Sequence, residues 1–360
     1  MNLGILLGIG ESLSQMEKSG QKGRFINQYL TRYSKDFEKV YLFSYADESD
    51  NLPKNVILVP KKSSLHRYLY ALLIPLINRK QIKDCDVIRG FGLTSAVPAL
   101  LISKPFIRRK TSFIFNLPYD YSGFLKIEKK YYLIPLFKVL EKLAFSKAKI
   151  VLVATKQMLK TQKRLKFIYF PNGVDLTVFR RKGSLGKGLV FIGRLEKQKN
   201  LFFLIDAVSK LPENMRSVTF VGSGSQEFHL KKYATKKKVS LKILPPIKNS
   251  QLPKLLSKFS IFTLPSLAEG SPKVLLEAMA LGLVPVVTNF STAKEVIKDN
   301  LNGFITNYDA KTYSRKLEML IKDSDLRKKM SKNAIQSVSD NFNLEKLIAH
   351  EIKILKEVAK

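Results

Sequence analysis

The chain has 360 residues, of which 45% are hydrophobic, so it is long enough for two domains of ordinary size and too apolar to be a disordered protein. Its 63 Lys and Arg residues against 29 Asp and Glu residues give a formal net charge of +34, which calls for an anionic partner. A single cysteine, Cys85, excludes an internal disulfide and fits a reducing compartment. No apolar run reaches the ~20 residues of a membrane span, and the N-terminus has no signal-peptide pattern, so we expect a cytoplasmic protein without a targeting segment.

The first half of the chain alternates short apolar runs with helical patterns. A helix is expected from about Gly23 to Ser34, after a glycine-containing loop. Strands that alternate with helices predict a parallel sheet with crossover helices. The expected strands are 3–7, 40–44, 56–59, 87–89, 111–115 and 150–155.

Two short motifs in this half match ligand-binding patterns, one for a dinucleotide and one for a metal, but their context argues against both sites. Gly8-Ile9-Gly10 begins a G-x-G-x-x-G pattern, but Leu13 stands where the third glycine belongs, which argues against a dinucleotide site. Asp84-Cys85-Asp86 matches the D-x-D pattern of metal-dependent glycosyltransferases. It lies immediately before the strand at 87–89, whereas ligands of open α/β sheets bind beyond the carboxyl ends of the strands. We therefore expect a structural turn there and no metal.

A strand, a tight loop and a helix start follow one another at 260–282. The apolar run at 260–265 predicts a buried strand, and Ser271 followed by Pro272 predicts an N-cap and a first helical residue. The start of a helix presents unpaired N–H groups and a positive dipole end, which suit a phosphate. Glu269 and Glu277 flank this site, and carboxylates accept hydrogen bonds from sugar hydroxyls. The arrangement predicts a sugar-nucleotide site.

Here the sequence resembles a known family. Glu269 and Glu277, separated by seven residues and followed by Ala-Met-Ala-x-Gly, are similar to the E-x7-E signature of retaining GT-B glycosyltransferases of family GT4, the glycosyl transferases group 1. The segment from Gly193 through Arg194 to Lys199 resembles that family's G-R-L-x-x-x-K-G loop, with Asn200 in place of the last glycine.

The resemblance implies an α/β protein of the GT-B fold, with two Rossmann-like domains whose parallel sheets face each other across a cleft. The acceptor-side domain would be 1–170, completed by a helix at about 344–360, and the nucleotide-sugar donor domain 171–343. It implies a retaining hexosyltransferase that moves a hexose from a nucleotide-diphosphate sugar to a glycan or lipid-linked acceptor in polysaccharide or glycolipid biosynthesis. No metal and no cofactor are implied.

The resemblance also assigns roles. Arg194 and Lys199 would bind the donor diphosphate, Glu269 the sugar hydroxyls and Glu277 the ribose. Asn116 is the nearest match to a histidine that the family places at a strand end, with Asp120 as a second candidate. The other donor-side candidates are Gly10 (with the glycines at 20–23), Gly193, Gly222, Pro246 near the base, and the helix-start residues Gly270, Ser271, Pro272, Lys273, Val274 and Leu275.

Two alternatives stay open. A GT-B sugar-nucleotide 2-epimerase shares the fold and needs no acceptor, but the sequence has only three histidines and none near the expected cleft. A basic nucleic-acid binder would explain the charge, but the chain shows no interleaved stacking aromatics or reading helix.

The charge and two amphipathic stretches suggest a membrane surface. Residues 65–80 are apolar and aromatic between basic ends, and residues 124–138 mix Lys with Tyr, Phe and Leu. Both patterns are typical of interfacial segments, and equally of crossover helices with solvated lysines. We expect the first domain to dock on the anionic inner face of the cell membrane.

Overall fold

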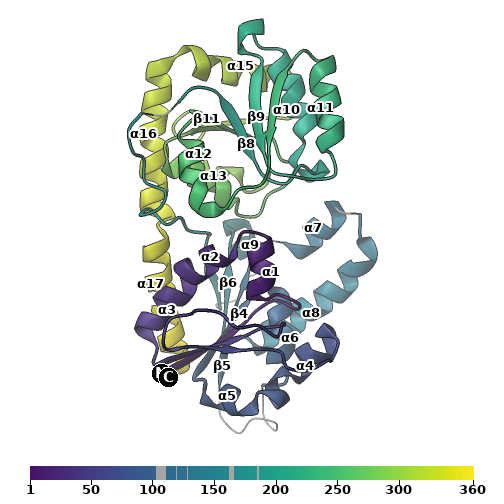
Figure 1. The fold of residues 1–360 in the computed structure, drawn as a ribbon, viewed down its shortest axis with the longest axis vertical. Helices are drawn as coiled ribbons and strands as arrows, with labels where there is room; N and C mark the ends of the chain where they lie inside the picture. Colours follow the sequence, from purple (N-terminus) through teal and green to yellow (C-terminus); the bar gives the residue numbers. More distant parts are fainter. Residues whose placement is uncertain (103–110, 119, 128, 162–165, 185) are drawn as a thin grey trace. The chain divides into compact units, whose positions relative to one another are not determined.

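The computed structural model describes residues 1–102, 111–118, 120–127, 129–161, 166–184 and 186–360. The chain forms two compact units (Figure 1). Unit 1 contains Met1–Pro171 and Glu345–Lys360, and unit 2 contains Asn172–Leu344. Glu128, in the stretch 124–138, lies outside the described residues, as does Tyr119.

Unit 1 is built on a seven-stranded parallel sheet in the order β3-β2-β1-β4-β5-β6-β7. The first strand is central, because Leu3 pairs with Val40 on one side and with Val87 on the other. The chain therefore winds outward in one direction, returns to the centre and winds outward in the other. The strands are β1 (Asn2–Leu6), β2 (Lys39–Phe43), β3 (Val56–Val59), β4 (Val87–Phe91), β5 (Ser112–Leu117), β6 (Ile150–Val153) and β7 (Phe167–Tyr169).

Helices cover both faces of this sheet. The helix expected at 23–34 is an α-turn, a π-helical turn and a second α-helix in succession. The helical elements are α1 (Leu13–Lys18), α2 (Lys22–Phe25), η1 (Ile26–Leu30), α3 (Thr31–Asp36), α4 (Arg67–Ile77), α5 (Arg79–Asp84), η2 (Leu93–Ser95), α6 (Ala96–Ala99), α7 (Tyr121–Ile127), η3 (Tyr131–Leu133), α8 (Ile134–Lys147), α9 (Lys156–Thr161) and α17 (Leu344–Ala359).

The two faces of the unit 1 sheet differ in chemistry. On one face, alternate strand residues such as Phe113 and Phe115 form an apolar core with Ala71 of α4 and Phe145 of α8. On the other face, β4 buries Arg89, which is 1% exposed. Its guanidinium pairs with Glu351 of α17 at 2.6 Å, so the last helix is fixed to the first unit by a buried ion pair.

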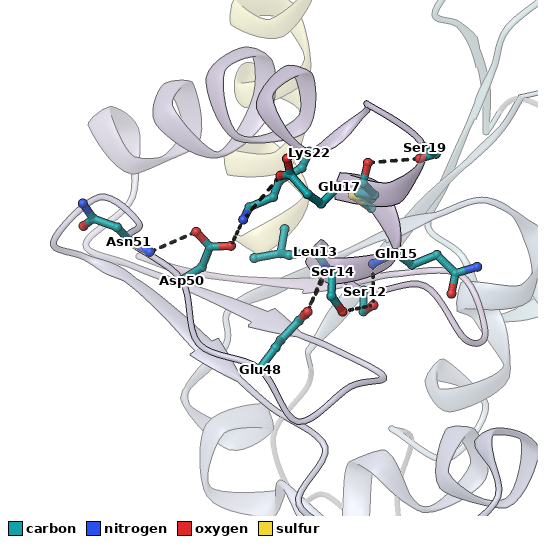
Figure 2. Close-up of polar contacts among 11 residues, drawn as sticks. Ser12, Leu13, Ser14, Gln15, Glu17, Ser19, Lys22, Glu48, Asp50 and Asn51 are labelled. Carbon is teal, nitrogen blue, oxygen red and sulfur yellow. Dashed lines mark hydrogen bonds and ion pairs between the residues drawn. The ribbon is translucent and has the colours of Figure 1, made fainter. Parts of the chain in front are cut away.

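The loop after β2 fastens the first helices of unit 1, as Figure 2 shows. The Glu48 carboxylate accepts the N–H groups of Leu13 and Ser14 at the start of α1, at 2.9 and 2.8 Å. Lys22 of α2 pairs with Asp50 of the same loop at 2.6 Å. Burial opposes ionisation of Glu48, but hydrogen bonds from Ser44, Ser14 and Leu13 outweigh it and hold its pKa below the ordinary value.

Unit 2 is built on a six-stranded parallel sheet in the order β10-β9-β8-β11-β12-β13. Its first strand is again central, so both units have the strand order of a Rossmann fold and the predicted fold class is confirmed. The strands are β8 (Leu189–Ile192), β9 (Ser217–Val221), β10 (Ser240–Leu244), β11 (Ile261–Leu264), β12 (Val284–Thr288) and β13 (Phe304–Thr306).

The helices of unit 2 enclose one continuous apolar core around this sheet. They are η4 (Lys197–Lys199), α10 (Leu201–Ser209), η5 (Glu213–Met215), α11 (Glu227–Lys236), η6 (Asn249–Gln251), α12 (Leu252–Leu256), α13 (Lys273–Ala280), α14 (Ala293–Val296), α15 (Ala310–Lys322) and α16 (Ser324–Asn341). None of the helices in the described part of the chain has the length and apolar character needed to cross a bilayer.

Candidate active site

The candidate site of unit 2 lies where its strand order reverses. β8 is the first strand of the unit and pairs with β9 on one side and β11 on the other, so the chain leaves β8 and β11 toward helices on opposite faces of the sheet. Open α/β sheets bind ligands at such a point, beyond the carboxyl ends of the two strands. The first loop contains Arg194 and Lys199, and the second contains Glu269.

The backbones after β8 and β9 approach each other very closely. A Cβ atom on Gly222, which has a φ of 146°, would lie 2.0 Å from the Gly193 carbonyl oxygen, so only glycine fits there. Glu196 joins the same two loops by accepting the N–H of Ser225 at 2.8 Å and its hydroxyl at 2.7 Å. These bonds, with the charge of Arg194, lower the pKa of Glu196. Gly193 and Gly222 thus shape the loop that presents Arg194.

An ion pair joins the loops after β8 and β11. Lys199 Nζ lies 2.5 Å from Glu269 Oε1, and the two side chains are only 15% and 9% exposed. The Ser266 hydroxyl donates to the same carboxylate oxygen at 2.6 Å, and the Thr292 hydroxyl donates to the Glu269 carbonyl at 2.9 Å. Glu269 is therefore held in one orientation from three directions.

Gln198 is a further bridge between the two loops. Its Nε2 donates to the Ala268 carbonyl at 2.8 Å, and its own carbonyl accepts the Leu267 N–H at 2.9 Å. Its Oε1 accepts from Arg194 Nη2 at 3.3 Å, while the Arg194 side chain is otherwise exposed. Sequence reasoning missed Gln198 because an amide can bond in many places, and its position between Arg194 and Lys199 was the one available signal.

The helix after the second loop begins one residue later than expected. α13 starts at Lys273 with Pro272 in the cap position, so the prediction of Ser271 as the N-cap was wrong. Pro272 has an extended backbone with ψ of 98°, which moves the first helical turn beyond it. The Ser271 hydroxyl accepts the Asn172 N–H at 3.3 Å, and its carbonyl accepts from Asn172 Nδ2 at 2.6 Å.

The start of α13 forms one wall of the site. The loop carries Gly270 and Ser271, and the first helical turn carries Lys273, Val274 and Leu275. The amide groups of a first helical turn point along the axis away from the helix body, and the helix dipole adds positive potential there. An anion between Arg194 and this turn would therefore be favoured.

Glu277 lies deeper in α13 and is 3% exposed. Asn249 Nδ2 donates to Glu277 Oε1 at 3.1 Å, which brings the loop after β10 to this carboxylate. Pro246, the residue expected near the base, is exposed in that loop. Sequence reasoning missed Asn249 because the contact spans 28 residues and belongs to no motif.

The candidates of unit 1 have other partners. Gly10 follows β1 with a φ of 83°, and the neighbouring Ile9 N–H bonds to Thr94 at 3.1 Å. Asn116 Oδ1 accepts from the Gly92 N–H at 2.9 Å and from Arg89 Nη1 at 3.0 Å. Asn116 therefore fixes the loop after β4, and Asp120 is exposed just before α7.

The D-x-D match lies at the amino end of β4. Asp84 accepts the Tyr41 hydroxyl at 2.6 Å and pairs with Lys39 at 3.5 Å, and Asp86 accepts the Asn2 N–H at 2.8 Å. These bonds lower the pKa of Asp84, the Tyr41 hydroxyl being the largest cause. The described residues contain no group of three or more His, Cys, Asp or Glu side chains placed to hold a metal ion.

Comparison with known proteins supports the family resemblance. Residues 181–337, which include both site loops and α13, match the family model of the glycosyl transferases group 1. The match covers less than half of the chain and lies within unit 2. The earlier identification from the E-x7-E segment is thereby confirmed.

Curated members of the family match part of the chain. An α-1,3-galactosyltransferase of Escherichia coli, named for UDP-Gal and α-D-GlcNAc-diphosphoundecaprenol, is 29% identical over 203 residues, or 51% of this chain and 52% of the relative. An α-1,4-N-acetyl-D-galactosaminyltransferase of Campylobacter jejuni, also named for an undecaprenol-linked substrate, is 28% identical over 175 residues, or 47% and 48%. The chain thus spans about half the length of the curated relatives it matches.

Solved structures match the whole chain and show the GT-B fold. Sucrose-phosphate synthase of Thermosynechococcus elongatus superposes with a TM-score of 0.79 at 14% identity, over 99% of each chain. The HepE protein of Anabaena, solved in a complex with UDP, superposes with a TM-score of 0.77 at 18% identity, over 99% of this chain and 100% of that one.

Proposed function

We propose that this chain is a retaining, metal-independent glycosyltransferase that moves a hexose from a nucleotide-diphosphate sugar to a glycan or lipid-linked acceptor. The observation that carries the proposal is the Lys199–Glu269 ion pair, where the loops after β8 and β11 meet beside the first turn of α13. In the donor, the sugar is bonded directly to the diphosphate. A carboxylate that binds the sugar and a cation that binds the diphosphate therefore have to be adjacent, as Glu269 and Lys199 are.

The departing diphosphate is the charge that the site has to stabilise. Arg194 offers a planar set of donors, Lys199 a point charge, and the start of α13 a fixed dipole. Such preorganised donors are effective because they need no reorientation during the reaction. Together they would supply the positive charge that a metal ion supplies in other transferases.

The two glutamates would have separate tasks. Glu269 is next to the cations and held by Ser266, so it suits the sugar hydroxyls beside the reacting carbon. Glu277 is deeper in α13 beside Asn249, and suits the ribose hydroxyls. When donor phosphate oxygens arrive, Lys199 would turn from Glu269 toward them, and Glu269 would gain the freedom to accept sugar hydroxyls.

The reaction is proposed to occur on one face of the sugar. The bond from the anomeric carbon to the diphosphate oxygen breaks as the acceptor hydroxyl forms its bond to the same carbon from the same side. The departing phosphate oxygen takes the acceptor proton, so the products are a glycoside with unchanged anomeric configuration and a nucleoside diphosphate. The family resemblance supports retention.

The acceptor and the location are proposed from the relatives. Two of them are named for undecaprenol-linked substrates, which favours a lipid-linked acceptor and a place at the inner face of the cell membrane. A lipid-linked acceptor needs a protein that reaches the membrane surface, and the net charge of +34 suits anionic lipids. No specific nucleic acid is expected as a partner.

A panel of nucleotide sugars tests the donor class. A ligand that binds only the folded state raises the apparent stability, so one or more of these donors should raise the melting temperature. The product made from that donor should keep the anomeric configuration by NMR. A panel without any stabilising donor, an inverted product, or conversion of the donor to its 2-epimer without an acceptor would refute the proposal.

Excess chelator tests the independence from metal. Activity should survive, because Arg194, Lys199 and the start of α13 already supply positive charge. Loss of activity that Mn²⁺ or Mg²⁺ restores would contradict this part of the proposal.

A further inference from the structure

Two helices of unit 1 are apolar on both sides. α4 packs Tyr70, Ala71 and Ile74 into the core, yet Leu69, Leu72 and Leu76 on its opposite side are 43–47% exposed. These three leucines follow the spacing i, i+3, i+7, so they form one stripe. A helix that is apolar all round is normally buried, and the outer side of α4 has no cover within the described chain.

α8 repeats the pattern. It packs Ala144 and Phe145 inward, while Leu136, Val139 and Leu143 on its outer side are 62%, 57% and 44% exposed at the same i, i+3, i+7 spacing. The turn before it, η3, adds Tyr131 and Tyr132 at 60% and 75% exposure. More than half of the large apolar side chains exposed in the described residues lie on α4, η3 and α8.

The two stripes lie on the same side of unit 1. α4, α6 and α8 all pack on the face of the sheet that carries Phe113 and Phe115, and α6 contacts both of the other helices (Figure 1). The outer sides of α4 and α8 therefore point away from the sheet in the same general direction. We call the exposed apolar residues of α4, η3 and α8 the outer face; they are Tyr68, Leu69, Leu72, Leu76, Ile77, Tyr131, Tyr132, Leu136, Val139 and Leu143.

Basic residues surround the outer face. Arg67 begins α4, Arg79 begins α5 just beyond the end of α4, and Lys138 and Lys142 lie along α8; all four are exposed. Glu141 is the one acidic side chain among the described residues of α4, α7, η3 and α8, and burial together with the charge of Asp120 raises its pKa. The outer face thus combines aromatic and aliphatic groups with a positively charged margin.

We propose that the outer face docks on an anionic lipid bilayer, with Tyr131 and Tyr132 at headgroup depth and the α4 and α8 stripes toward the acyl chains. Lysine and arginine at the margin would meet lipid phosphates, which is the arrangement of interfacial helices. A second copy of the chain is a poor occupant, because two faces with cationic margins would meet on chains of net charge +34. Nucleic acid would leave the leucine stripes in water. The inference deepens the proposed function and depends on it for the lipid-linked acceptor.

Vesicle co-sedimentation without any nucleotide sugar tests the docking. The chain should sediment with vesicles of phosphatidylcholine and phosphatidylglycerol, much less with phosphatidylcholine alone, and less as salt is added. Lys138→Glu with Lys142→Glu should weaken the apparent vesicle affinity by about 25-fold or more, since each basic residue near an anionic surface is worth about fivefold. Tyr132→Ser with Leu136→Ser should weaken it as well, because it removes apolar side chains that insert into the bilayer.

Matched variants in unit 2 control for charge and exposure. Lys329→Glu with Lys332→Glu on α16 makes the same change in net charge, and Phe228→Ser on α11 removes an aromatic side chain that is 73% exposed. Both should bind vesicles like the unaltered chain. Equal weakening by control and outer-face variants would mean diffuse charge attraction and would refute the docking face, as would the absence of sedimentation with anionic vesicles at low salt.

Two further measurements separate the possible failures. Dimers in solution that the Tyr132→Ser, Leu136→Ser variant abolishes would assign the outer face to a second copy and refute the bilayer. Nucleotide binding measured without vesicles should be the same in all variants. Vesicle binding without nucleotide binding would refute the proposed function and leave the docking standing, and the reverse result would refute the docking alone.

Discussion

Lys199 and Glu269 neutralise each other across the two loops of the candidate site, at 2.5 Å and with little exposure to water. Arg194, on the same loop as Lys199, is exposed and bonds only weakly, to Gln198 at 3.3 Å. The two cations assigned to the diphosphate therefore start from different states. In the proposed mechanism, Arg194 can receive the diphosphate directly, whereas Lys199 has to exchange a carboxylate for a phosphate.

Alanine substitutions of the cations should lower turnover. Arg194→Ala and Lys199→Ala should each reduce kcat by about 100-fold or more, because each removes a proposed donor to the departing diphosphate. Lys197→Ala, an exposed neighbour on η4, is the matched control and should leave kcat unchanged. Steady-state kinetics measures kcat, and thermal melting checks that the variants are folded. If kcat of the first two variants is close to that of the unaltered chain, these residues have no part in the mechanism.

Substitutions of the two glutamates should affect different parts of donor binding. Glu277→Ala should weaken the binding of both the free nucleoside diphosphate and the donor, because its carboxylate is assigned to the ribose. Glu269→Ala should leave the free diphosphate bound and impair sugar transfer. Calorimetry with the two ligands measures the difference, and equal loss of affinity for the sugar-free ligand in both variants would contradict the division of roles.

Glu48 should make the stability of unit 1 sensitive to acid. Its folded-state pKa is below the ordinary value, so its hydrogen bonds to α1 stabilise the fold above the unfolded-state pKa and are lost as the pH falls through the folded-state pKa. Glu48→Gln should cost about 1 kcal/mol of unfolding free energy at neutral pH and less at acidic pH. Asp47→Asn, exposed in the same loop, is the control for denaturant unfolding across pH. A pH-independent difference between Glu48→Gln and the unaltered chain would count against the ionic contact.

The buried Arg89–Glu351 pair should be costly to break from one side. Glu351→Gln should destabilise unit 1 by about 3–5 kcal/mol, because it leaves the Arg89 charge buried without its counter-ion. Arg89→Met combined with Glu351→Leu should recover much of this loss, since it removes both charges together. Chemical denaturation of Arg89→Met, Glu351→Leu and the double variant measures the cycle, and additive losses would show that the two charges do not interact.

Sequence patterns predicted the architecture because each strand and its following helix are encoded locally. The run at 260–265 and the helix that ends before Gly282 are both present, as β11 and α13. The cap of α13 was mispredicted, because the choice between Ser271 and Pro272 depends on Asn172, 99 residues away. Arg89 appeared only as the end of a strand, and nothing local indicates that its partner is on the last helix.

Part of the candidate site could also be predicted from local motifs, and part could not. The motifs placed Arg194, Lys199 and Glu269 on loops after strands, and the strand order brings those loops together. The contact of Lys199 with Glu269 depends on packing between residues 70 positions apart. The bonds from Ser266 and Asn249 to the two carboxylates, and the bridge that Gln198 forms between the loops, likewise belong to no local motif. The role of Asn116 in fixing the loop after β4 was likewise beyond any local pattern.

The return of α17 to unit 1 sets an order of events on the ribosome. Arg89 is synthesised 262 residues before Glu351, and domains generally fold as they emerge. Unit 2 is a continuous segment that can complete its core while Arg89 still waits for its counter-ion. The unit that is translated first is therefore the last to become native, and a chain interrupted between Leu344 and Glu351 would carry an incomplete first unit beside a complete second one.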